Sequence, residues 1–109
     1  MTITSEVLGQ IFDVIESRKG GDPTSSHTAK LFSKGTEKIA QKVGEEAVEA
    51  VIEAMKGDKA GLTSESADLL FHLMVLWADQ GVKPEEVWAE LARRQGISGI
   101  DEKNSRAKT

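Results

Sequence analysis

The stretch from Thr63 to Gln80 is the feature that most restricts how this chain can fold. With about 100° between successive residues of a helix, its ionisable side chains Glu65, Asp68, His72 and Asp79 fall on one narrow strip. The apolar residues 69–71 and 73–78 fill the remaining circumference. A surface helix of a globular protein carries an apolar stripe only a little wider than about 100°. The pattern therefore predicts a helix that is buried on nearly all sides.

The segment 36–56 repeats this design. Its polar stripe consists of Lys38, Lys42, Glu45, Glu46, Glu49 and Glu53. Valine, isoleucine, alanine and methionine cover the rest of the helix, again over an arc too wide for a helix lying on a small core. Two such arcs in a chain of 109 residues predict that a second copy covers what one chain leaves open. We therefore expect a homodimer that completes a larger helical bundle.

The composition favours an all-α fold, because helix formers outnumber β-branched residues and there are only two prolines. We expect a bundle of four main helices, completed by homodimerisation. The expected helices are 6–18, 36–56, 63–80 and 84–95, with a short helical turn at 27–32, a linker at 19–26 and a loop at 58–62. Thr36 is the expected N-cap of the second main helix. The domain is expected to span residues 1–95, followed by a polar tail, 96–109.

Several functional classes are disfavoured by composition. The chain has no cysteine, so it lacks thiolate ligands and thiol nucleophiles. Its net charge of −4 argues against a nucleic acid polymer as the partner. No secretory signal is visible, and the longest apolar run, 69–78, is too short to span a bilayer. A cytoplasmic protein without membrane contact is the expectation.

The acidic stripes permit a structural or a functional interpretation. A charged stripe is usually a solvated helix face, but Glu45, Glu49 and Glu53 form a row of like charges that repel one another. For Glu65 and Asp68, the structural alternative is a buried salt bridge to Lys38 or Lys42, because a carboxylate on an apolar helix is costly without a partner.

The functional interpretation is a divalent metal site. Glu46 and Glu49 lie one turn apart on one helix, and Glu65 and Asp68 lie one turn apart on the next. If the two helices pack antiparallel, the four carboxylates converge. Oxygen ligands without cysteine favour Mg²⁺ or Mn²⁺. Glu45 adds a further carboxylate, as a ligand or as a base for water.

A di-iron carboxylate bundle is the competing metal site. Such bundles use Glu-x-x-His repeats, whereas this chain has Glu-x-x-Glu and Glu-x-x-Asp. His72 follows Asp68 by four residues, and it is better interpreted as a hydrogen-bonded core histidine than as a ligand.

Four lysines, Lys30, Lys34, Lys38 and Lys42, are spaced by four residues. They could form ion pairs within their helices, such as Lys42 with Glu46. They could also contact phosphate oxygens that a metal ion does not neutralise. No glycine-rich phosphate loop of the P-loop kind is present.

Three blocks of this sequence resemble one known family. They are TAKLFSKGT at 28–36, KIAQKVGEE at 38–46 followed by Glu49, and ESADLLFHL at 65–73. These blocks closely resemble phosphoribosyl-ATP pyrophosphohydrolase, of the all-helical superfamily that includes the MazG and dimeric dUTPase types. The resemblance extends from about residue 6 to residue 106. The bare acidic pattern is shared by the whole superfamily, but the first two blocks are far more specific.

The resemblance implies hydrolysis of the α–β phosphoanhydride of phosphoribosyl-ATP to phosphoribosyl-AMP and pyrophosphate, the second step of histidine biosynthesis. It implies Mg²⁺ ligands at Glu46, Glu49, Glu65 and Asp68, with Glu45 beside them as the candidate base. Lys30, Lys34 and Lys42 become candidates for phosphate or ribose contacts, and Lys38 lies on the same stripe. His27 stands where the family is expected to carry a tyrosine, so any ring contact to substrate is altered.

Two other functions stay open at this point. The same metal site could serve a hydrolase of free nucleoside triphosphates, which a substrate panel would distinguish. The chain could also be a non-catalytic helical interaction module, whose thermal stability would not respond to Mg²⁺ and nucleotide.

Overall fold

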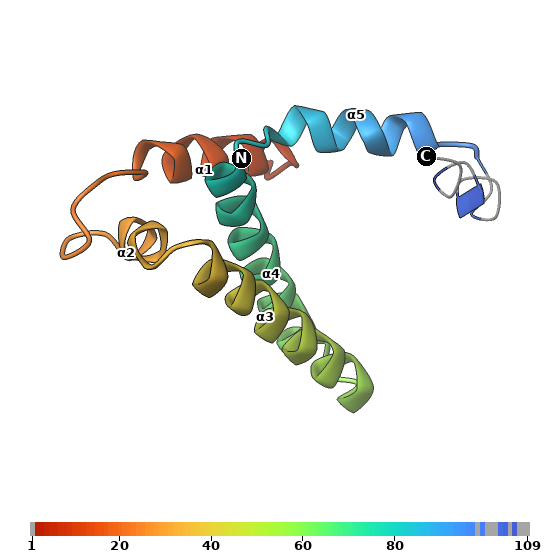
Figure 1. Cartoon of the computed structure of the whole chain (residues 1–109). Coiled ribbons are helices and arrows are strands. Elements are labelled where there is room, and N and C mark those ends of the chain that lie inside the picture. The colour runs from red at the N-terminus through yellow and green to blue at the C-terminus, as the bar shows by residue number, and fades with distance from the viewer. Residues whose placement is uncertain (1, 98, 100–102, 105, 107–109) are drawn as a thin grey trace.

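The computed structural model describes residues 2–97, 99, 103, 104 and 106 (Figure 1). The described part contains five α-helices and no β-strand: α1 (Glu6–Ser17), α2 (His27–Lys34), α3 (Thr36–Lys56), α4 (Lys59–Gln80) and α5 (Pro84–Arg94). The predicted all-α class is confirmed. Most of the predicted tail, 96–109, lies outside the described residues.

Helices α3 and α4 form a long antiparallel hairpin (Figure 1). Gly57, in the left-handed region at φ 73°, ends α3, and the side chain of Asp58 accepts a hydrogen bond of 2.9 Å from the backbone N–H of Gly61. That N-cap starts α4 at Lys59. The predicted loop at 58–62 is therefore wrong, because the capping aspartate brings the helix forward by four residues.

Helix α2 meets α3 at a sharp break. It extends beyond the predicted turn 27–32, to Lys34, and only Gly35 separates it from α3. The predicted N-cap at Thr36 is wrong, since Gly35 occupies the cap position and Thr36 is already helical. The Thr36 hydroxyl instead donates a 2.6 Å hydrogen bond to Asp79 Oδ2, which ties the start of α3 to the end of α4.

The hydrophobic core lies at the end of the hairpin where α1 and α2 pack on it. Ile15, Ile39 and Val75 are completely enclosed there. The other residues of the buried cluster are Phe12, Leu31, Met74 and Ala78. This core fixes the first half of α3 and the second half of α4 relative to each other.

Helix α5 projects away from the hairpin (Figure 1). Its start is anchored by the buried Pro84, by an edge-to-face contact of 5.9 Å between the rings of Trp77 and Trp88, and by a 2.7 Å ion pair between Lys83 and Glu16. Beyond this anchor the helix exposes Leu91 over 57% of its surface.

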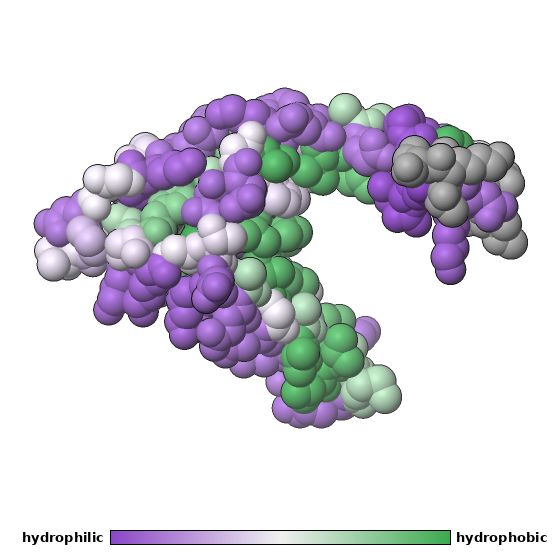
Figure 2. Space-filling model, in the orientation of Figure 1, coloured by the Kyte–Doolittle hydropathy of each residue, from purple (hydrophilic) through white to green (hydrophobic). Residues whose placement is uncertain are grey.

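The single chain leaves much apolar surface uncovered. Predicted burial of the 63–80 helix on nearly all sides is not reached within one chain, since Leu70 is 43% exposed. On α3, Val48, Val51, Ile52 and Met55 are all exposed. Figure 2 shows hydrophobic surface along the hollow between the hairpin and α5. Among the described helices, none has the length and apolar character needed to cross a membrane.

Candidate metal centre

Three carboxylates converge where α3 and α4 face each other. Glu46, Glu49 and Glu65 each offer one oxygen atom, and these atoms all lie within 4.8 Å of one another. The first two come from successive turns of α3, and the third comes from α4 across the hairpin. The predicted convergence of acidic side chains from two antiparallel helices is therefore present for three of the four proposed ligands.

Glu65 has the most unusual surroundings of the three. Its side chain is half-buried, and its enclosed Oε2 atom has no hydrogen-bond partner among the described residues. Hydrogen bonding with the Glu49 carboxylate, which needs a shared proton, raises the pKa of Glu65 most, followed by burial and by Glu46. Together these effects raise the pKa of Glu65 from its ordinary value of 4.5 to about 7.

A divalent cation fits this arrangement on chemical grounds. An enclosed carboxylate oxygen without a partner is costly, and so is the repulsion among adjacent carboxylates. A cation bound among Glu46, Glu49 and Glu65 would satisfy the free oxygen and offset the repulsion. Because all the donors are oxygen atoms, the site suits Mg²⁺ or Mn²⁺.

Asp68 and Glu45 lie outside this group of three. Asp68 is exposed, one turn after Glu65 on α4. Glu45 is also exposed, and its Oε1 accepts a 3.3 Å hydrogen bond from the side-chain amide of Gln41. Gln41, Glu45 and Glu49 line one open groove along α3. Gln41 was not singled out from the sequence, although its position four residues before Glu45 is a signal for such a contact.

His72 is a core residue, as predicted. It is buried, its Nδ1 lies 2.9 Å from the backbone oxygen of Asp68, and its ring meets Phe71 edge to face. The same Nδ1 is 3.9 Å from Glu46 Oε1. His72 is thus a neighbour of the carboxylate cluster and is not one of the three converging residues.

The lysines do not neutralise the acidic groups. Among the described residues, none of Lys30, Lys34, Lys38 and Lys42 forms an ion pair. The alternative pairings of Lys42 with Glu46, and of Lys38 or Lys42 with Glu65 or Asp68, are therefore absent. Glu53, on the same stripe, pairs instead with Lys56 at 3.2 Å.

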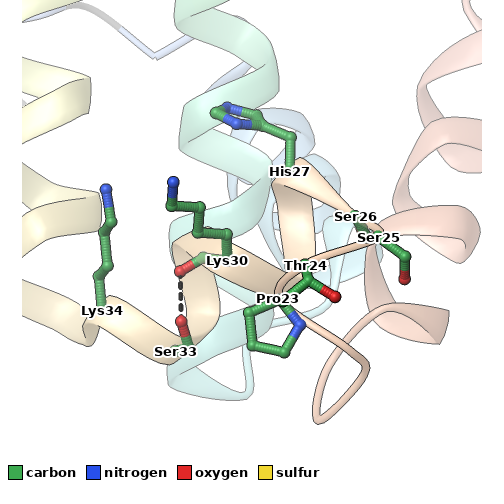
Figure 3. Close-up of a pocket in the computed structure, with 8 residues that line it drawn as sticks. All are labelled: Pro23, Thr24, Ser25, Ser26, His27, Lys30, Ser33 and Lys34. Carbon is green, nitrogen blue, oxygen red and sulfur yellow. Dashed lines mark hydrogen bonds between the residues drawn. The ribbon is translucent and has the colours of Figure 1, made fainter.

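Lys30 and Lys34 line a cavity of about 530 Å³ together with His27 (Figure 3). Lys38 and Lys42 are half-buried on α3, between this cavity and the carboxylates along the helix. A row of lysines that lack ion-pair partners in the described part of the chain thus extends from α2 to the cluster of Glu46, Glu49 and Glu65. The positive charge of such a row is complementary to the negative charge of a ligand with several phosphate groups.

Comparison with known proteins supplies the family. The family described as "Phosphoribosyl-ATP pyrophosphohydrolase" matches residues 8–95. The chain is 64% identical over 104 residues to "Phosphoribosyl-ATP pyrophosphatase" of Azospirillum brasilense, covering 95% of this chain and 94% of that protein. It is 62% identical over 108 residues to the protein of the same name from Paramagnetospirillum magneticum, covering 99% of both. The chain belongs to the phosphoribosyl-ATP pyrophosphohydrolase family, the enzymes of histidine biosynthesis that its sequence blocks resemble.

Proposed function

We propose that this protein hydrolyses the α–β phosphoanhydride of phosphoribosyl-ATP in a Mg²⁺-dependent reaction, giving phosphoribosyl-AMP and pyrophosphate. Family membership supports the substrate. The observation that carries the metal dependence is the convergence of three carboxylates around an enclosed, unpartnered oxygen of Glu65. This reaction is the second step of histidine biosynthesis.

The proposed metal ligands are Glu46, Glu49, Glu65 and Asp68. The first three supply the converging oxygens. Asp68 is included because it follows Glu65 by one helical turn and is exposed at the same side of the hairpin. When bound, Mg²⁺, or Mn²⁺ in its place, neutralises negative charge on the phosphate oxygens of the substrate.

The remaining polar residues are proposed to position substrate and water. Glu45, held by the Gln41 amide, is the candidate for orienting or deprotonating the attacking water, because its carboxylate is outside the group of three. Lys38 and Lys42 lie on α3 without ion-pair partners in the described chain and are proposed to contact the triphosphate. Catalysis would then rest on positioning and electrostatic stabilisation.

A homodimer is proposed as the active form. Its support is the exposed apolar face of α3 and the exposed Leu91 of α5, which no other described segment covers. A second copy of the same chain would bury these surfaces by symmetry. The dimer would extend the α3–α4 hairpin into a larger bundle.

The reaction is tested by measuring pyrophosphate release from phosphoribosyl-ATP and from a panel of deoxynucleoside triphosphates, with and without Mg²⁺. We expect Mg²⁺-dependent release with a strong preference for phosphoribosyl-ATP. Glu53→Gln is the matched control for substitutions of the proposed ligands, because the Glu53 carboxylate is on the same stripe of α3 but pairs with Lys56. We expect this variant to keep wild-type activity. Deoxynucleoside triphosphate turnover at rates rivalling phosphoribosyl-ATP would contradict the substrate assignment and favour a general nucleotide hydrolase.

A further inference from the structure

A second candidate site, which is cationic, lies on α2, apart from the carboxylate cluster. The cavity of about 530 Å³ is lined by His27, Lys30, Ser33 and Lys34 of α2 and by residues 23–26 of the preceding loop. The spacing of three and four residues puts the three basic side chains on one helix face. In Figure 3 the ammonium groups of Lys30 and Lys34 point the same way, on the side of α2 that also carries the His27 ring.

The cavity lining is cationic, and none of the described residues that form it is acidic. Within the described residues, neither lysine forms an ion pair, so the two ammonium groups repel each other across one turn. Asp22, just outside the lining, is occupied by hydrogen bonds from the backbone and hydroxyl of Thr24, which lower its pKa. An anion in the cavity would relieve the repulsion, as a cation would among the carboxylates.

The hydroxyl groups of the cavity are already engaged. The Ser26 hydroxyl accepts the 3.1 Å hydrogen bond that caps α2, and the Ser33 hydroxyl donates 2.7 Å to the backbone oxygen of Lys30. These bonds hold the loop and the helix in place while the two ammonium groups remain available. The arrangement therefore suits a charged phosphate better than a neutral sugar hydroxyl.

The connection from the α2 cavity to the carboxylate cluster is short. Gly35 alone separates α2 from α3, and the ten helical steps of α3 from Thr36 to Glu46 span about 15 Å. Lys38 and Lys42 occupy the intervening turns. A ligand with phosphate groups at two ends could therefore engage the carboxylate cluster and the α2 cavity at once.

Phosphoribosyl-ATP is such a ligand, since it carries a triphosphate on one ribose and a separate 5′-monophosphate on the other. Resting on the proposed function, we propose that the cavity formed by His27, Lys30 and Lys34 binds this 5′-monophosphate, while the metal centre binds the triphosphate. The cavity then distinguishes phosphoribosyl-ATP from ATP and other nucleoside triphosphates, which have no second phosphorylated end. In this proposal, α2 selects the substrate, whereas α3 and α4 carry the carboxylates at which the phosphoanhydride is cleaved.

The test compares Lys30→Ala and Lys34→Ala with wild type in three measurements. These are kcat/KM for phosphoribosyl-ATP, the inhibition constant of ATP, and binding of ribose 5-phosphate by calorimetry. We expect each variant to lower kcat/KM by about tenfold or more, mainly through KM, as for the loss of one charge-assisted contact. The inhibition constant of ATP should be unchanged, and ribose 5-phosphate binding should be weakened. Lys59→Ala, an exposed lysine at the far end of the hairpin, is the control.

The outcomes separate this proposal from the proposed reaction. Equal weakening of ATP and phosphoribosyl-ATP would assign Lys30 and Lys34 to the triphosphate and overturn the subsite. Unchanged kcat/KM and unchanged ribose 5-phosphate binding would also overturn it. If wild type fails to hydrolyse phosphoribosyl-ATP, the proposed reaction is wrong. Ribose 5-phosphate binding that depends on both lysines would still support the subsite, and absence of such binding would refute it.

Discussion

At the scale of single residues, the proposed metal centre depends on the enclosed oxygen of Glu65. The sequence could predict that acidic side chains from two helices meet, because helical spacing fixes which residues share a face. It could not predict that Glu65, and not Asp68, joins Glu46 and Glu49 in the group whose oxygen atoms lie within 4.8 Å of one another. That difference depends on how the two helices are rotated against each other, which the packing of the core decides.

The raised pKa of Glu65 makes the stability of the metal-free protein depend on pH. The carboxyl titrates near 4.5 in the unfolded chain and at about 7 in the folded protein. A carboxyl whose pKa is raised on folding stabilises the fold fully below about pH 4.5, and this contribution is lost as pH rises through about 7. With chelator present, we expect the Tm to fall between pH 5 and pH 8. Thermal unfolding of Glu65→Gln should show a flatter profile, and an identical profile would contradict the assignment.

Magnesium should act in the opposite direction, because the cation competes with the proton at Glu65. We expect Mg²⁺ to raise the Tm of wild type more at pH 8 than at pH 6, since the carboxyl is ionised at the higher pH. Glu65→Gln should lose most of this response, while Glu53→Gln keeps it. A Tm increase that is the same at both pH values would count against Glu65 as a ligand.

Single substitutions test which of the proposed metal ligands are needed for activity. Glu49→Gln and Asp68→Asn are each expected to lower kcat by about 100-fold or more, as for the loss of a group that stabilises transition-state charge. Circular dichroism should show an unchanged helical content, because both side chains are exposed. Near-normal activity of Asp68→Asn alone would restrict the ligands to the group of three. Near-normal activity of Glu49→Gln would refute the metal centre.

At the scale of helices, sequence periodicity predicted the existence of the elements better than their ends. The bounds of α3 follow from Gly35 and Gly57, which can be recognised in the sequence as helix stops. The start of α4 lies four residues before the predicted position at Thr63, because Asp58 determines the start through its cap. The position of Thr36 inside α3 depends on its tertiary hydrogen bond to Asp79, which local pattern cannot reveal.

Gly35 sets the angle between the cationic helix α2 and the acidic helix α3. Its φ of 91° and ψ of 171° lie in a region that only glycine adopts readily. Gly35→Ala is therefore expected to lower the free energy of unfolding by about 1–3 kcal/mol. Urea unfolding would measure this loss, and KM for phosphoribosyl-ATP should rise as α2 is displaced.

Gly9→Ala is the matched control for that experiment. Gly9 lies inside α1, and a Cβ added there would meet no atom within 4 Å. Alanine should stabilise the helix by about 0.5–1 kcal/mol relative to glycine. If both variants changed stability alike, the strained conformation at Gly35 would have no energetic role.

At the scale of the whole molecule, the single chain leaves apolar surface of α3 and α4 exposed. The wide apolar arcs of these two helices in the sequence predict such uncovered surface. The arcs could be recognised from the sequence, but the projection of α5 could not, because it depends on the Trp77–Trp88 contact and on Pro84. Exposed apolar side chains on α3 and α5 face solvent in one copy (Figure 2). The proposed homodimer is the arrangement that would cover them.

Sedimentation tests this dimer. Wild type is expected to sediment as a dimer at micromolar concentration, whereas Val51→Glu should dissociate it. A glutamate at this position, 61% exposed in one chain, would bury an unpaired charge in the interface. Gln10→Glu on the exposed side of α1 should leave the dimer intact. A wild-type monomer at assay concentrations would contradict the proposed assembly.

The proposed reaction is tested most directly by ³¹P NMR of phosphoribosyl-ATP incubated with wild-type enzyme, with Mg²⁺ or with chelator. We expect pyrophosphate and one nucleotide product, phosphoribosyl-AMP with its two phosphomonoester groups, to accumulate only when Mg²⁺ is present. Release of orthophosphate with formation of a diphosphate product, or equal rates in chelator, would contradict the proposed cleavage at the carboxylate cluster.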